Sequence, residues 1–189
     1  MDLLTWMRKN SRALRHAGSF LSYAESQESI LLVGPFAAAL APFYRNLGYD
    51  GPLYSYEGGE GYERSLMVTS IECVDSICGK YSVIAAPLYI QSLSVRELTT
   101  FLFDSYDSLS DGGLLYISFP EAIAPSVGEK TLVDSFYSEG KIYMKYYSLV
   151  DVLQSTEAVG FSISAIEMDE VDFHDRLISL ALKKGEKRA

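Results

Sequence analysis

The feature that most constrains the fold is a short apolar run followed at once by a turn and a helical pattern. Residues 30–33 (ILLV) are apolar without alternation, which is typical of a strand covered by helices on both faces. Gly34 and Pro35 end this run, and apolar residues then recur at helical spacing through 36–47 until Gly48. This order predicts the central unit of an open α/β sheet. Such sheets bind ligands outside the carboxyl end of a central strand, so the turn at Gly34 is the candidate binding site.

The alternation of strands and helices continues along the chain. Ser94 and Glu97 are spaced as a capping box, and Ser148 is placed to cap a further helix that ends at Gly160. Residues 120–147 break the rhythm and are expected to form a long functional connection. The expected strands are 30–33, 53–56, 68–71, 81–86, 114–119, 161–168 and 177–182, and the expected helices are 36–47, 62–68, 94–109 and 148–159.

This pattern predicts an α/β fold, a doubly wound and mostly parallel seven-stranded sheet with helices on both faces. We expect a single domain over residues 1–189, with the α/β core in 28–184. Residues 1–27 are expected to add an N-terminal helical extension with a basic face that includes Arg8, Arg12, Arg15 and His16. That face either is solvated or meets an acidic partner, an anionic substrate or a nucleic acid.

Charge and composition exclude several classes of function. The net charge is −9 and the pI is about 4.7, whereas a nucleic-acid-binding domain needs a surplus of Lys and Arg. The cysteines Cys73 and Cys78 and the histidines His16 and His174 lack the clustered spacing of a zinc site, so we expect buried thiols and no metal. No apolar run reaches the length of about 18 residues that a membrane-spanning helix needs, and no signal-peptide core is seen. These features predict a cytoplasmic protein that does not span a membrane.

Two longer stretches resemble a known family. The runs YSVIAAPLYIQSLSVRELTTFLFDSYDSLSDGGLLYISFP (81–120) and YYSLVDVLQSTEAVGF (146–161) are similar to the second half of class I S-adenosylmethionine-dependent methyltransferases. The resemblance covers about residues 28–184. It implies S-adenosylmethionine as cofactor and a small molecule as methyl acceptor.

The resemblance also marks departures at the cofactor turn. In the family, the first strand ends in an acid, one apolar residue and a G-x-G-x-G loop whose backbone approaches the cofactor. Gly34 matches the first glycine, but Leu32 stands in place of the acid, and Phe36 and Ala38 stand in place of the second and third glycines. Because close backbone approach is what glycine permits, Phe36 is expected to narrow the cofactor cleft.

The remaining candidate residues follow the next strands. Glu57 ends the second strand and enters a glycine-rich turn, where a carboxylate can accept hydrogen bonds from a ribose diol; the alternative is a flexible acidic turn. The resemblance assigns adenine contacts to the end of the third strand, and methionine and acceptor contacts to the segment after the fourth. The corresponding residues are Ile71 and Glu72, and then Ala86, Pro87 and Leu88.

The sequence leaves the activity open between different classes. No acceptor-specific base stands out, and Glu121, Tyr143 and Tyr147 are candidates only through their place in the long connection. One hypothesis is a small-molecule methyltransferase, and the second is a methyltransferase-like domain that has lost its cofactor and acts as an interaction or regulatory subunit. A nicotinamide-dependent oxidoreductase ranks behind both. A homodimer is also a hypothesis, through apolar surface near the N-terminal extension.

Overall fold

The computed structural model describes residues 15–16, 18–23, 28–34, 37, 40–56, 71–122, 130–134, 141–145, 147–170 and 175–185. Its elements, in chain order, are η1 (Phe20–Tyr23), β1 (Ile30–Val33), α3 (Ala41–Asn46), β2 (Leu53–Tyr56), β3 (Glu72–Cys73), β4 (Tyr81–Pro87), η3 (Ile90–Ser92), α4 (Val95–Ser108), β5 (Leu109–Ala122), β6 (Lys130–Asp134), β7 (Lys141–Lys145), α5 (Leu149–Val159), β8 (Phe161–Glu170) and β9 (Asp175–Lys184).

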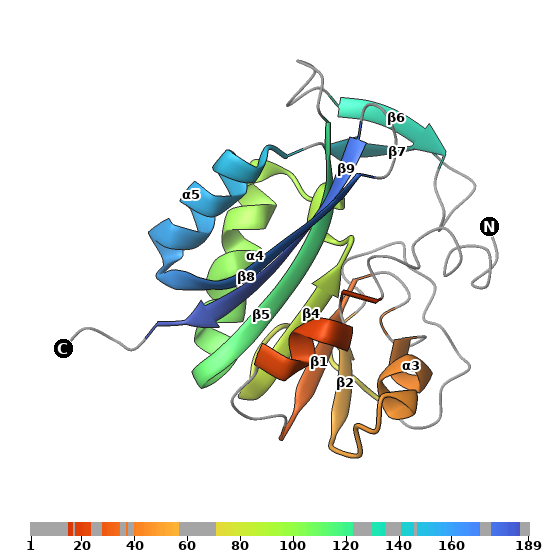
Figure 1. Ribbon diagram of the computed structural model, residues 1–189, viewed down its shortest axis with the longest axis vertical. Coiled ribbons are helices and arrows are strands. Elements are labelled where there is room, and N and C mark those ends of the chain that lie inside the picture. The colour runs from red at the N-terminus through yellow and green to blue at the C-terminus, as the bar shows by residue number, and fades with distance from the viewer. Residues whose placement is uncertain are drawn as a thin grey trace.

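The strands of the main sheet run mostly in one direction. The sheet has seven strands in the order β3-β2-β1-β4-β5-β9-β8. Figure 1 shows β2, β1, β4 and β5 side by side. Strands β1 to β5 pair in parallel, whereas β9 pairs antiparallel with both β5 and β8. The predicted mostly parallel seven-stranded sheet is therefore confirmed. Strands β6 and β7 form a separate antiparallel hairpin.

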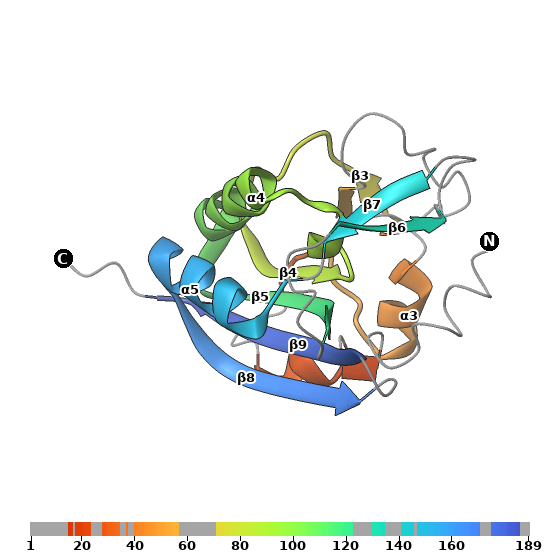
Figure 2. The same cartoon turned by 90° about the horizontal axis from the view of Figure 1, so that it is seen from above.

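Helices cover both faces of this sheet, as predicted. Helices α4 and α5 lie on one face, and α3 and η1 lie on the other (Figure 2). Adjacent residues of β1 point to opposite faces, so Leu31 packs in the core cluster beneath α4 and α5, and Leu32 packs in the cluster with α3 and η1. All four β1 residues are buried, which explains why the sequence of this strand does not alternate.

The helix caps form as the sequence predicts. The Glu97 backbone N–H donates to Ser94 Oγ at 3.3 Å, and the Ser94 N–H donates to Glu97 Oε2 at 2.7 Å, which completes a capping box at α4. At α5, the Asp151 N–H donates to Ser148 Oγ at 3.1 Å, and the helix ends at Gly160 with φ of 110°. These caps fix both helices on the same face of the sheet.

Three local expectations are wrong. The long connection at 120–147 contains the β6 and β7 hairpin, which the sequence analysis did not predict. Cys78 is exposed, because it lies in the turn before β4 instead of in a strand, while Cys73 lies in β3. His16 belongs to no solvated basic face, since it is only 7% exposed.

Other expectations fall partly outside the described residues. The predicted helix 62–68 lies outside them, and so does most of the extension 1–27. Within that extension, residues 15, 16, 18 and 19 are helical and continue into η1. None of the helices in the described ranges is long and apolar enough to cross a bilayer.

The buried hydroxyl of Tyr44 gives a stability prediction. Tyr44 is fully buried in the cluster with α3 and η1, and its hydroxyl has no hydrogen-bond partner among the described residues. Burial raises the pKa of this phenol, and the neighbouring Tyr116 raises it further. Because an unpartnered buried hydroxyl costs free energy, we expect Tyr44→Phe to raise the free energy of unfolding by roughly 1 kcal/mol. Urea denaturation of both proteins measures this difference.

Tyr116→Phe is the matched control for Tyr44→Phe. The Tyr116 hydroxyl lies 3.4 Å from Ser179 Oγ, so its removal breaks a buried contact. We expect Tyr116→Phe to be neutral or destabilising. A larger loss of stability in Tyr44→Phe than in Tyr116→Phe would contradict this account.

Candidate functional site

The candidate site lies where β1, β2 and β4 end. Strand β1 aligns Leu32 with Ala85 of β4, so Gly34 and Pro87 each follow that pair by two residues. The Gly34 N–H donates to the Tyr56 carbonyl at the end of β2, at 2.8 Å. The sheet therefore brings Gly34 to the same edge as Ala86, Pro87 and Leu88, as the sequence analysis predicted for a crevice at the carboxyl end of the strands.

The backbone at Gly34 requires glycine. Its φ is 110°, a value that side-chain-bearing residues rarely adopt. A Cβ atom at this position would lie 3.1 Å from Tyr89 Cδ2 and 3.2 Å from Tyr89 Cβ. Tyr89 itself is 7% exposed and packs edge to face on Phe101 of α4, with ring centroids 5.2 Å apart. Tyr89 therefore closes one side of the turn, and Gly34 itself is buried.

The turn after β4 also holds an unusual backbone conformation. Leu88 has φ of 56°, in the left-handed region that leucine seldom occupies. Its N–H donates to the Ser118 carbonyl at 3.0 Å and lies 3.1 Å from Ser118 Oγ. These bonds from β5 hold the strained turn at the edge, and strain of this kind is common at ligand sites.

Two predicted cofactor residues lie outside the described residues, namely Phe36 and Glu57. Their neighbours in sequence are placed: Gly34 precedes Phe36 by two positions, and Tyr56 directly precedes Glu57. The roles predicted for both stay predictions.

The structure does not bring Ile71 and Glu72 to this edge. Glu72 aligns with Tyr54, which in turn aligns with Leu31, three residues before Gly34. Burial raises the pKa of Tyr81, the first residue of β4, and interactions with Cys78, Tyr54 and Glu72 raise it further.

Ile71 precedes β3 and packs with the cluster on the α3 face. The expected strand ended too early, because β3 pairs through Glu72 and Cys73.

The acidic residue that follows β3 is Asp75, which the sequence analysis missed. Strand β3 ends at Cys73, and the Val74 N–H donates to the Ser55 carbonyl of β2 at 2.8 Å. Asp75 is the next residue and is exposed. The available sequence signal was an acidic residue near the end of a short strand. The expected strand ended at Ile71, so this signal was assigned to Glu72.

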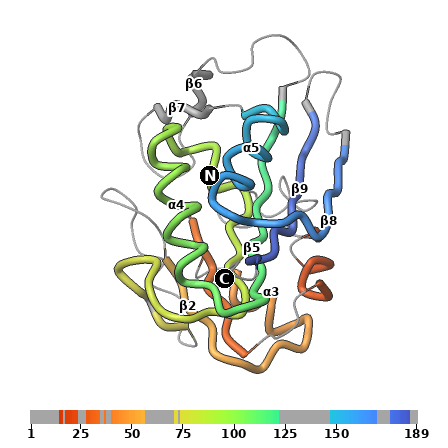
Figure 3. Tube along the Cα trace, turned by 90° about the vertical axis from the view of Figure 1, so that its left-hand side faces the viewer, coloured from red at the N-terminus to blue at the C-terminus, as the bar shows by residue number. Residues whose placement is uncertain are grey.

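The β6 and β7 hairpin lies near the same edge. Strand β7 contacts η3, the turn of helix that follows β4. Figure 3 shows α4 and α5 side by side over one face of the sheet. The hairpin within the long connection 120–147 therefore lies beside the segment that follows β4.

Two of the candidate bases are engaged elsewhere. The Tyr147 hydroxyl donates to the Leu93 carbonyl at 2.8 Å, and burial, with a contribution from Glu97, raises the pKa of Tyr147 to about 12. Glu121 accepts from the Leu149 N–H at 2.5 Å and from Arg176 Nε at 2.6 Å. Both side chains are therefore held in hydrogen bonds within the fold. The Tyr143 side chain lies outside the described part of the structure.

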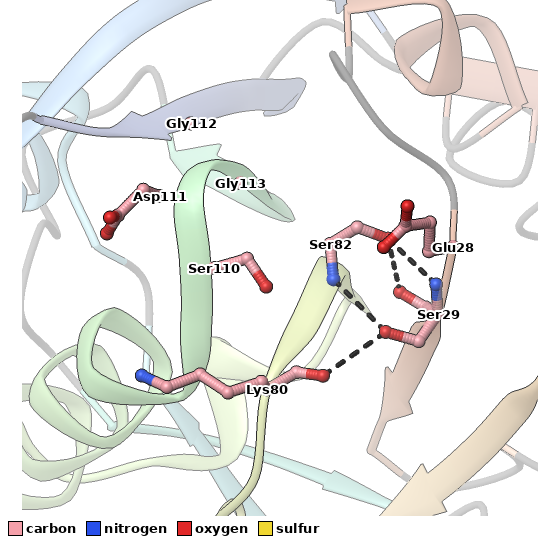
Figure 4. A pocket seen from close by; sticks show the side chains of 8 residues that line it. All are labelled: Glu28, Ser29, Lys80, Ser82, Ser110, Asp111, Gly112 and Gly113. Atoms are coloured by element: carbon pink, nitrogen blue, oxygen red, sulfur yellow. Dashed lines mark hydrogen bonds between the residues drawn. The ribbon is translucent and has the colours of Figure 1, made fainter.

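A polar pocket opens at the other end of the strands, where the parallel strands begin. Its volume is about 350 Å³, and Figure 4 shows its lining at the beginnings of β1, β4 and β5. Ser29 and Ser82 bond reciprocally there, with Ser82 Oγ donating to the Ser29 carbonyl at 2.7 Å, and Lys80 Nζ donates to the Asp107 carbonyl at 2.8 Å. These groups join strand ends to each other, away from Gly34. Within the described ranges, no cluster of His, Cys, Asp and Glu could hold a metal ion.

Comparison with known proteins places the fold. No family model matches the chain, and no curated protein matches its sequence. A methyltransferase from Methanosarcina mazei, described as S-adenosylmethionine-dependent, matches with a TM-score of 0.67 and 10% identity over 89% of this chain and 98% of its own. Another from Mesorhizobium loti matches with a TM-score of 0.59 and 13% identity over 93% and 97%.

A third similar structure contains ligands. The 1,6-didemethyltoxoflavin-N1-methyltransferase of Burkholderia thailandensis, with bound 1,6-didemethyltoxoflavin and S-adenosylhomocysteine, matches with a TM-score of 0.64 and 12% identity over 92% of this chain and 79% of its own. At these identities the matches show the fold alone. The chain has the class I methyltransferase fold, as its sequence resemblance implied.

Proposed function

We propose that the protein is an S-adenosylmethionine-dependent methyltransferase that acts on a small molecule. The observation that carries this proposal is the edge formed by Gly34, Pro87 and Leu88, at the carboxyl end of the central strands of a class I methyltransferase fold. The hairpin near η3 supports a small acceptor, because it provides a cover for a ligand held at this edge.

The proposed cofactor site uses backbone groups and two carboxylates. Gly34 forms the turn beneath the proposed ligand, and Tyr89 fills the space on its Cβ side. Glu57, which follows Tyr56, takes the ribose hydroxyls, and Asp75 replaces Glu72 as the acidic residue after β3. The cofactor supplies an activated methyl group when it is bound. The protein then needs mainly to orient the acceptor and exclude water, so the engagement of Glu121 and Tyr147 elsewhere does not contradict the proposal.

Cofactor binding tests this proposal directly. We expect titration calorimetry to show micromolar binding of S-adenosylmethionine and S-adenosylhomocysteine. Because Glu57→Ala removes charge-assisted hydrogen bonds, it should weaken binding by roughly 1 to 3 kcal/mol. Asp75→Ala should weaken binding as well. Glu72→Ala is the matched control, because this exposed residue aligns with Tyr54, two positions before the end of β2, and it should leave the affinity unchanged.

A second candidate function is favoured by the way Tyr89 packs on Gly34. A tyrosine against the turn, together with Leu32 in place of an acid, fits a methyltransferase-like domain that has lost its cofactor and serves as an interaction or regulatory subunit. Absence of binding by the folded wild-type protein supports this second function. Binding that is insensitive to Glu57→Ala would instead remove Glu57 from the site.

A further inference from the structure

Strand β8 is an open edge of the main sheet. It is the last strand in the sheet order, and within the described part of the chain it pairs only with β9 (Figure 2). An edge strand of ten residues presents unpaired backbone N–H and C=O groups on its outer side. Backbone groups of this kind can pair with a further strand, and the side chains of the edge decide which strand fits.

The face of β8 toward α5 carries apolar side chains that nothing in the described structure covers fully. Ile163, Ile166 and Met168 are 49%, 38% and 55% exposed. They lie across from Leu182, Leu180 and Ile178 of β9, which belong to the buried cluster beneath α4 and α5. The apolar core of the sheet therefore continues outward to the edge.

The opposite face of β8 is covered by the N-terminal segment. His16 Nε2 lies 3.2 Å from Glu167 Oε2 and 3.2 Å from Asp169 Oδ2, and His16 Nδ1 lies 2.9 Å from Ser179 Oγ. These contacts hold the two carboxylates on the η1 side. The part of β8 that remains available is thus its outer backbone edge and the apolar face.

The distribution of charge along β8 is what selects a partner strand. The first half of the strand, residues 161–165, has no charged residue, whereas the second half contains Glu167, Asp169 and Glu170. A parallel copy of β8 would place acids beside acids. An antiparallel copy places the acidic half of each strand beside the uncharged half of the other. The uncharged half also lies next to Lys183 of β9, which aligns with Ser162. The edge is therefore complementary to itself only in the antiparallel direction.

We propose that two copies of this chain associate through β8, antiparallel and about a two-fold axis, so that their sheets join into one. In this arrangement Ile163 lies across from the partner's Met168, and Ser162 lies across from the partner's Asp169. An isologous contact of this kind buries both apolar strips at once. The bulge at Ser164, between the Ile163 and Ala165 pairs with β9, interrupts the edge and keeps the association weak.

Sedimentation velocity of the full chain at increasing concentration tests the proposal. We expect a reversible dimer with a dissociation constant on the order of tens of micromolar, as for a small interface. The double variant Ile163→Lys/Met168→Lys should weaken the dimer at least about tenfold, because it buries charge at the apolar strip. Phe103→Lys is the matched control, since Phe103 is 50% exposed on α4, away from β8, and its replacement should leave the dimer unchanged.

A pair of variants at Ser162 tests the orientation. Because Ser162 would face the partner's Asp169 twice per dimer, Ser162→Lys should tighten the dimer and Ser162→Glu should weaken it, each by about three- to tenfold. Ser162 is exposed, so both variants should fold. A monomer at about 500 µM, where such a dimer would predominate, overturns the proposal. A dimer that is unaffected by the Ile163 and Met168 changes, or shifted in the same direction by both Ser162 variants, overturns it as well.

Discussion

Replacing Glu121 with alanine should lower the free energy of unfolding by roughly 2 to 4 kcal/mol. Glu121 is 6% exposed near the end of β5, where its carboxylate accepts from Arg176 Nε of β9 and from the first backbone N–H of α5 at Leu149. The variant leaves that helix N–H and the Arg176 guanidinium without their acceptor. Because the Arg176 side chain is 39% exposed, water can solvate part of its charge, which sets the cost below that of a fully buried pair.

Two further variants separate the contributions to this loss. Glu121→Gln keeps an oxygen that can accept from the Leu149 N–H but removes the negative charge, so we expect about half of the loss, roughly 1 to 2 kcal/mol. Arg176→Ala in the Glu121→Ala background should cost little more, because the two residues form one network. Urea unfolding of the wild type, Glu121→Ala, Arg176→Ala and the double variant measures the cycle. If Glu121→Ala stays within about 0.5 kcal/mol of the wild type, the carboxylate does not hold these elements together.

Replacing Gly34 with alanine should have a similar effect by a different cause. The alanine has to adopt a backbone φ of 110°, and its Cβ lies 3.1 Å from Tyr89 Cδ2 and 3.2 Å from Tyr89 Cβ. Backbone strain and this contact together predict a loss of roughly 2 to 4 kcal/mol in the free energy of unfolding. The turn would also shift, so we expect any binding of S-adenosylmethionine to be lost in the folded variant. Thermal unfolding and calorimetry measure the two effects separately.

Gly48→Ala is the matched control for Gly34→Ala. Gly48 follows α3 with φ of 88°, and apart from its two chain neighbours no atom of the described residues lies within 4 Å of the position that a Cβ would take. Its replacement therefore reports backbone strain alone, which we expect to cost roughly 1 kcal/mol. Equal losses at the two glycines would mean that Tyr89 gives way easily and that the turn is not tightly packed.

The sheet and its covering helices were predictable because their sequence signals are strong. The buried run at 30–33 and the box of Ser94 and Glu97 each appear in the structure where they were expected. The β6 and β7 hairpin was not predictable. Its segments KTLVD and KIYMK mix charged and apolar residues, and they pair with each other instead of with the main sheet.

Part of the candidate site was predictable from the sequence, namely Gly34 and the residues after β4, whereas the positions of Glu72 and Tyr89 were not. Gly34 and the residues after β4 follow from the rule that ligands bind at the carboxyl ends of strands. The sequence analysis placed Glu72 at the end of the third strand, because a strand of two residues leaves little sequence signal for where it ends. Only the pairing with Tyr54 shows how far along the sheet Glu72 lies. Tyr89 was missed because it follows an apolar strand and looks like ordinary core, while its contact with Gly34 spans 55 positions of sequence.

The two anchors of the hairpin have a consequence for how this protein can change over evolutionary time. Glu121 fastens the chain to α5 and β9 just before residues 123–146, and Tyr147 fastens it to Leu93 just after them. Mutations, insertions and deletions between these two points act on a segment whose ends are held by the core. Under the proposed function, selection can therefore change the segment near the proposed site with little cost to the stability of the sheet.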